Sequence, residues 1–178
     1  MNRVFNAGLL LAGVLYPFAV YFGTEHVSPR QLGLLLGALW LARALSGRGQ
    51  KGLAWVALAF CAVIAWLGDA HLLRWYPVLI SAGLLAIFSL SLSHGMPVVE
   101  RLARLSDPEL PPRAVRYTRR VTQVWSLFFL ANGLVAATLA LWAPLAWWTL
   151  YTGLIAYVLM GLLFAGEWMT RRRVRALP

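Results

Sequence analysis

VTQVWSLFFLANGLVAATLALW, residues 121–142, is the stretch that decides the fold, and it carries no charged side chain. A bilayer core about 30 Å thick is crossed by a helix of about 20 consecutive apolar residues. In lipid, a spanning segment must satisfy its own backbone hydrogen bonds, and this run is continuous rather than alternating like a barrel strand. The stretch therefore predicts a transmembrane helix.

Five further apolar runs flank this stretch, and charged residues bound most of them. Pro144 separates residues 121–142 from the next run so closely that we expect a tight hairpin between two helices. Two runs are short, so we expect the bilayer to thin around them while nearby Arg and Lys side chains reach the headgroups. The six expected spans are residues 4–22, 31–45, 52–67, 72–91, 121–142 and 145–166. The sequence thus predicts an all-α, polytopic integral membrane protein with a single transmembrane domain over residues 1–178.

The composition agrees with lipid as the main solvent. Of 178 residues, 61% are hydrophobic and 12% are charged, whereas soluble domains are about 45–50% apolar and about 25% charged. We expect Trp142, Trp147 and Trp148, at the predicted hairpin, to form part of an aromatic belt at the headgroup level. The net charge of +10 comes from basic residues in short gaps between apolar runs, which favours anionic phospholipid over nucleic acid as a partner.

The distribution of Lys and Arg predicts the orientation, because positively charged loops are retained in the cytoplasm. With six spans, fourteen of the sixteen basic residues fall on one side, and Arg30 and Arg74 fall on the other. The basic side holds Arg3, Arg43, Arg48, Lys51, Arg101, Arg104, Arg113, Arg116, Arg119, Arg120, Arg171, Arg172, Arg173 and Arg175. We therefore expect both termini to lie in the cytoplasm, and the protein to lie in a bacterial inner membrane.

The longest polar stretch, residues 94–120, is expected to form a cytoplasmic loop. Within it, residues 97–105 alternate apolar and charged positions at helical spacing, which predicts a short helix lying in the interface. The prolines that follow are expected to end this short helix. Beyond them, a helix continuing into the fifth span would carry a stripe of arginines able to hold phosphate groups. The candidate lipid-headgroup residues are Arg113, Arg116, Arg119 and Arg120. The simpler interpretation is retention in the cytoplasm together with general lipid contact.

Polar residues inside the expected spans are interpreted as contacts between helices. The set comprises Asn6, Gln123, Ser126, Asn132 and Thr138, and such side chains commonly hydrogen-bond across membrane helices. Gly33 and Gly37 have the GxxxG spacing that lets a neighbouring helix approach closely.

No established catalytic motif is found in the sequence, which lacks HExxH, GxSxG and a Gly-rich phosphate loop. Glu25 with His26, and Asp69 with His71, could share a metal or run acid–base chemistry if two outer loops met. Solvated loop caps are the simpler interpretation of these four residues. We expect no enzyme, no metal and no cofactor, and we interpret Cys61 as a small packing residue.

Several short motifs of the chain carry a resemblance to a known family. They are MPVVER at 96–101, PELP at 108–111, QVWSLFF at 123–129, Asn132-Gly133, WAP at 142–144 and LYPFAVY at 15–21. In these motifs and their order, the chain resembles the bacterial intracellular septation protein A family of inner-membrane proteins. The resemblance implies a membrane-spanning protein linked to envelope integrity and cell division, and it carries no catalytic residues with it. This chain is richer in Arg and Trp, and it has six expected spans where that family is usually drawn with five. Its size and arginine-rich loop also resemble small uncharacterised membrane proteins encoded beside polyene or fatty-acid synthesis genes.

Three functions follow from these patterns. The first is a non-enzymatic envelope or septation protein that contacts other inner-membrane proteins or a second copy of itself. The second is a lipid-handling transporter, or an accessory to lipid or polyene biosynthesis, that uses the arginine-rich loop. The third is an enzyme built on the outer-loop acids and histidines. We expect the first, with lipid handling as the alternative.

Overall fold

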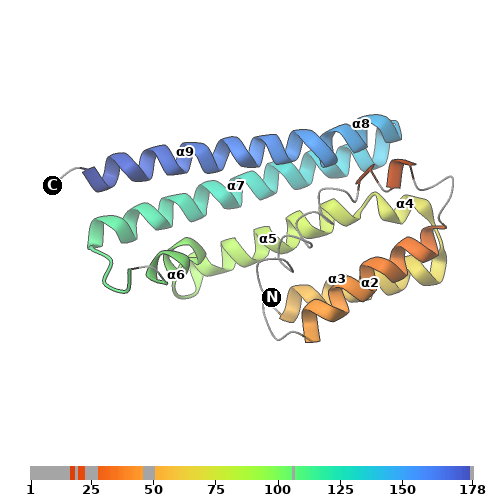
Figure 1. Cartoon of the computed structure of the whole chain (residues 1–178), viewed down its shortest axis with the longest axis horizontal. Coiled ribbons are helices and arrows are strands. Elements are labelled where there is room, and N and C mark those ends of the chain that lie inside the picture. Colours follow the sequence, from red (N-terminus) through yellow and green to blue (C-terminus); the bar gives the residue numbers. More distant parts are fainter. Residues whose placement is uncertain (1–16, 19, 23–27, 46–50, 106, 177–178) are drawn as a thin grey trace. The chain divides into compact units, whose positions relative to one another are not determined.

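The computed structural model describes residues 17–18, 20–22, 28–45, 51–105 and 107–176. Every regular element in these ranges is helical (Figure 1), which confirms the all-α prediction for them. The elements are α2 (Pro29–Leu45), α3 (Lys51–Leu67), α4 (Ala70–Leu73), α5 (Tyr76–Ser93), α6 (Val98–Arg104), α7 (Pro112–Trp142), α8 (Leu145–Leu150), the π-helical turn η1 (Tyr151–Ile155) and α9 (Ala156–Ala176). Most of the expected span 4–22 lies outside the described residues.

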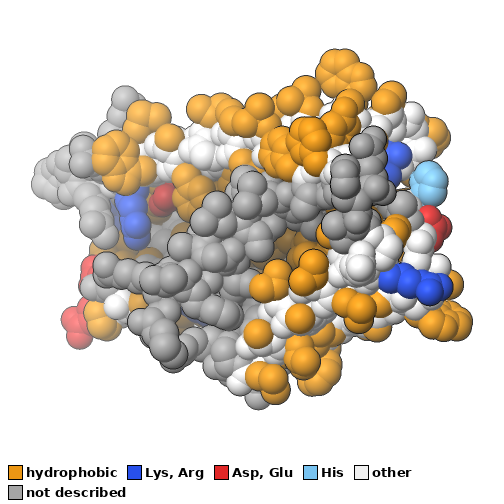
Figure 2. Space-filling model, turned by 45° about the vertical axis from the view of Figure 1, so that its right-hand side comes forward, with side chains coloured by type: hydrophobic (Ala, Val, Ile, Leu, Met, Phe, Trp, Pro, Cys, Tyr) orange, Lys and Arg blue, Asp and Glu red, His pale blue; other side chains and the backbone are white. Residues whose placement is uncertain are grey.

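Three helical segments among the described residues are long and apolar enough to cross a membrane. They are His71–Ser93, Pro112–Trp142 and Leu145–Arg171, and they contain the expected spans 72–91, 121–142 and 145–166. The helix Ala54–Leu67 is apolar but shorter. Figure 2 shows many hydrophobic side chains at the surface in the view that it draws. Leu127, Leu134 and Leu162 are each more than 60% exposed. Such lengths and surfaces are typical of an integral membrane protein.

Two compact units make up the chain, and each has its own core. The first comprises residues 1–80 with 136–157, and the second comprises residues 81–135 with 158–178. In the first, Leu36, Cys61 and Ile64 join α2 to α3 in a buried cluster. Cys61 is 2% exposed, as expected for a packing residue. Gly33 permits this contact, because a Cβ atom there would lie 2.9 Å from Ile64 Cγ2 and 3.0 Å from the Ala65 backbone nitrogen.

The hairpin predicted at Pro144 is present in the first unit, where α7 ends at Trp142 and α8 begins at Leu145. Trp142 and Trp147 are exposed, as an aromatic belt requires, whereas Trp148 is fully buried. The prediction that Trp148 joins the belt is therefore wrong. Its indole Nε1 donates to the Arg74 carbonyl at 3.1 Å. Trp148 is buried while Trp147 is exposed because successive residues of a helix point in directions about 100° apart.

The guanidinium of Arg74 closes the end of α7 within the same unit. Arg74 Nη2 donates to the carbonyls of Leu139 at 2.6 Å and Ala143 at 2.5 Å. Carbonyls in the last turn of a helix lack partners inside the helix, and a cation there also complements the helix dipole. Arg74 is therefore a helix cap.

The second unit packs α7 against α5 and α9 through an aromatic core. Val121, Trp125 and Phe129 recur every four residues along α7 and are buried, so they form one face of the helix. The rings of Trp125 and Phe164 lie 4.6 Å apart, and those of Phe88 and Phe129 lie 5.2 Å apart. This core holds the middle of α7 beside the amino-terminal half of α9.

Candidate functional site

Arg104 holds the segment that connects α6 to α7. The expected short helix is present as α6, and Arg104 extends from its last turn. Arg104 Nε and Nη2 donate to Glu100 Oε1 at 2.9 and 2.8 Å, and Nη1 donates to the Pro108 carbonyl at 2.8 Å. Glu100 is buried, so this ion pair neutralises a carboxylate inside the unit while holding the chain that leads to Pro112.

Because α7 begins at Pro112, the last part of the expected loop 94–120 is helical, and the candidate arginines lie on the first turns of a helix. Proline suits the first position of a helix, because a backbone N–H at that position would have no partner within the helix. Arg113 and Arg120 are seven residues apart, so they share one face of α7 to within about 20°. Arg116 lies beside that face, and all three side chains are exposed.

Arg119 is placed differently from the other candidates. Its Nη2 donates to the Leu92 carbonyl, near the end of α5, at 3.2 Å. On the helical wheel it lies about 100° from Arg120. The structure therefore brings Arg113 and Arg120 to one face, and it links Arg119 to α5.

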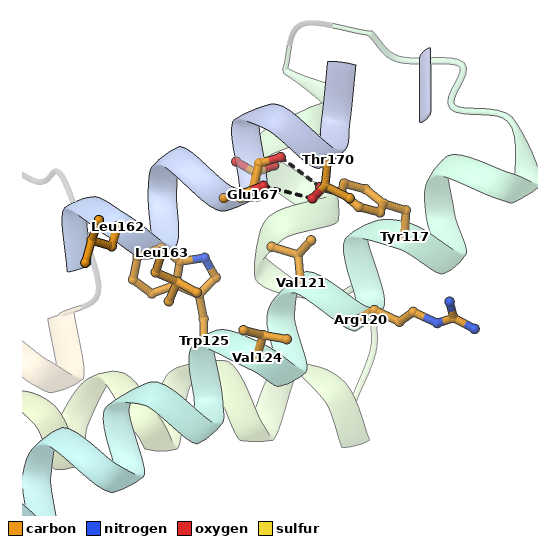
Figure 3. A pocket seen from close by; sticks show the side chains of 10 residues that line it. Tyr117, Arg120, Val121, Val124, Trp125, Leu162, Leu163, Glu167 and Thr170 are labelled. Atoms are coloured by element: carbon orange, nitrogen blue, oxygen red, sulfur yellow. Dashed lines mark hydrogen bonds between the residues drawn. The ribbon is translucent and has the colours of Figure 1, made fainter. Parts of the chain in front are cut away.

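A groove of about 470 Å³ runs between α7 and α9 within the second unit (Figure 3). This volume falls within the usual range for small-molecule sites, roughly 300–1,000 Å³. The apolar part is lined by Val121, Val124, Trp125, Leu162 and Leu163. Gly166 also lines the groove, and a Cβ atom there would meet nothing within 4 Å.

The polar part of the groove lies where the basic end of α7 meets the end of α9. Figure 3 shows Tyr117, Glu167 and Thr170 together there, with the Arg120 guanidinium extending outward at the rim. Tyr117 Oη donates to the Glu167 backbone carbonyl at 3.1 Å, across fifty residues of sequence. Thr170 Oγ1 donates to the Gly166 carbonyl at 2.8 Å. The groove thus combines an apolar trough with a polar mouth.

Sequence reasoning named Arg120 but missed the rest of the groove. Glu167 and Tyr117 are not among the candidate residues that the sequence offers. The one signal in the sequence is Gly166, which lies opposite the aromatic residues of α7. This glycine indicates a groove only when α7 and α9 are already known to be neighbours.

Of the four outer-loop residues, the structure describes Asp69 and His71. Glu25 and His26 lie outside the described residues. Asp69 Oδ1 accepts from the His71 backbone nitrogen at 2.8 Å and caps α4, which agrees with the loop-cap interpretation for that pair. Over the ranges that the structure describes, no group of three or more His, Cys, Asp or Glu side chains could hold a metal ion.

Comparisons with protein-family models, curated proteins and solved structures find no match to this chain. The resemblance to the septation family therefore stays a prediction.

Proposed function

We propose that this protein is a non-enzymatic phospholipid-binding protein of the bacterial inner membrane. The observation that carries the proposal is the groove between α7 and α9, whose apolar trough opens beside Arg120 of α7. A phospholipid has the same two-part character, with an acyl chain attached to a phosphate.

The apolar part of the groove suits an acyl chain. Its walls are aliphatic and aromatic side chains with no charge, and burying an acyl chain against them gains packing contacts. The trough runs from Leu162 and Leu163 toward Glu167 and Thr170 along α9, so a chain lying in it would place its headgroup at the polar mouth.

Arg120 at the mouth, with Arg113 about two turns away on α7, suits a phosphate. Arg120 lines the groove, Arg113 shares its face, and both are exposed and able to turn toward a ligand. A guanidinium binds a phosphate through two parallel hydrogen bonds, which a single ammonium cannot do. Basic residues at a membrane surface also gain about 1 kcal/mol each from anionic lipid.

Six spans with both termini in the cytoplasm are part of the proposal, and the asymmetric distribution of Lys and Arg supports them. Single cysteines in a Cys61→Ala background test the orientation, and exposed His71 and Glu109 are suitable positions. We expect a membrane-impermeant maleimide to label His71→Cys from outside the cell and Glu109→Cys from inside. Labelling of Glu109→Cys from outside would invert the topology.

The groove supports lipid handling more directly than it supports protein contacts. A role in envelope integrity or septation, and contacts with other inner-membrane proteins or a second copy of the chain, remain predictions from the resemblance. Lipid binding is compatible with them.

The test is lipid retention by the purified full chain. We expect Arg113→Gln combined with Arg120→Gln to lower phospholipid bound per protein by about tenfold or more, since each arginine contributes about 1 kcal/mol. Arg101→Gln removes one exposed charge on α6, at a residue that does not line the groove, and should retain lipid. Retention equal to wild type in the double variant would overturn the proposal.

A further inference from the structure

The end of the groove on α9 contains a carboxylate. Glu167 is half-buried and lines the groove. Among the described residues its carboxylate forms no ion pair or hydrogen bond, although Arg171 follows one turn later on the same helix. A carboxylate withdrawn from water is stabilised when a cation approaches it. This end of the groove therefore favours a positive group in the ligand.

Two hydroxyl groups beside Glu167 add to this preference. A hydroxyl has one proton to donate and lone pairs to accept with. Tyr117 Oη donates its proton to the Glu167 carbonyl, and Thr170 Oγ1 donates its proton to the Gly166 carbonyl. Both hydroxyls can therefore only accept a hydrogen bond from a ligand. With the carboxylate, they form a set of three acceptors at one end of the groove (Figure 3).

A primary ammonium group matches this set, because it carries three N–H donors and no acceptor. A quaternary ammonium has no N–H donor and would leave the three acceptors without hydrogen bonds. An uncharged polyol would leave the Glu167 carboxylate without a counter-ion. The three acceptors therefore discriminate among headgroups by the chemistry of the nitrogen.

We propose that the groove between α7 and α9 selects a phospholipid with a primary ammonium headgroup, with Glu167, Tyr117 and Thr170 accepting from the ammonium and Arg120 binding the phosphate. This rests on the proposed function, that the groove holds a phospholipid. Both charges of such a zwitterionic headgroup then have a counterpart, one on α9 and one on α7. The chemical class is that of phosphatidylethanolamine.

The experiment is competition between lipids for the delipidated full chain in detergent. Palmitoyl-oleoyl phosphatidylethanolamine and the matching phosphatidylcholine are added in equal amounts, and native mass spectrometry counts each lipid bound. Because hydrogen bonds to charged groups contribute about 1.5–3 kcal/mol, we expect wild type to prefer phosphatidylethanolamine by about tenfold. Glu167→Gln should remove most of this preference, and Thr170→Val should reduce it. Glu109→Gln, an equal charge change in the exposed loop before α7, should leave it intact.

Two further outcomes are distinguishable. If wild type binds both lipids equally, or if Glu167→Gln keeps the full preference, the headgroup assignment is overturned while the phospholipid groove stands. If neither lipid stays bound to wild type, the groove assignment and the headgroup assignment fail together. Thr170 is exposed, so its variant should fold and keeps the assignment testable if Glu167→Gln does not.

Discussion

The side-chain amide of Asn132 on α7 donates to the Ser81 hydroxyl on α5 at 3.0 Å. Gly133, the next residue, lets the helices approach here, since a Cβ atom would lie 3.2 Å from Ser81 Cβ. The prediction that Asn132 makes a polar contact between helices is confirmed. Such contacts between membrane helices typically contribute about 0.6 kcal/mol and at most about 1.7 kcal/mol.

A double-mutant cycle on Ser81→Ala and Asn132→Ala measures this pair. We expect a coupling free energy of about 0.6 kcal/mol, because each single change removes the same hydrogen bond. Chemical unfolding of the full chain in mixed micelles supplies the four unfolding free energies. Strict additivity of the two changes would show that the hydrogen bond contributes nothing to stability.

Close packing of α2 against α3 predicts different effects at the two glycines of the GxxxG pattern. A Cβ atom at Gly33 would lie 3.0 Å from the Ala65 backbone nitrogen and 3.2 Å from the Cys61 carbonyl oxygen, whereas at Gly37 it would lie 3.6 Å from Cys61 Cβ. Gly33→Ala should destabilise the protein by about 1–3 kcal/mol, because backbone atoms must move apart. Gly37→Ala, the matched control, should be tolerated. Thermal unfolding in detergent compares them, and equal melting temperatures would contradict the packing.

The ion pair of Arg104 and buried Glu100 predicts ordering of the chain before α7. Arg104→Gln should leave the Glu100 carboxylate without its cation and release the Pro108 carbonyl. We expect faster amide hydrogen exchange over residues 107–111 in this variant than in Arg101→Gln, which removes a neighbouring exposed charge. Unchanged exchange in Arg104→Gln would mean that other contacts hold this segment.

The apolar runs of the sequence located the long helices well. Residues 121–142 and 145–166 fall inside observed helices because an uncharged run of that length has no other stable form in lipid. The short helix α6 was also predictable, since its apolar and charged residues alternate at helical spacing. The arginines were expected on a helix, and they lie on α7.

The neighbours of each helix were harder to predict than the helices. Trp147 and Trp148 are adjacent in sequence, yet one is exposed and the other buried, because the direction of each side chain depends on how the hairpin packs. The groove depends on Tyr117 meeting Glu167 across fifty residues. No local sequence pattern encodes the pairing of Tyr117 with Glu167. The residues at the mouth of the groove were therefore not predicted as a set.

The phospholipid groove is tested most directly by filling it without changing any charge. Val124 lines the groove, whereas Val135 is a similarly exposed valine on α7 outside it. Phospholipid bound per purified full chain should be measured for wild type, Val124→Trp and Val135→Trp. We predict that Val124→Trp lowers bound lipid several-fold, because the indole occupies the space of the acyl chain, and that Val135→Trp binds as wild type does. Equal lipid binding by the two tryptophan variants would contradict a phospholipid site between α7 and α9.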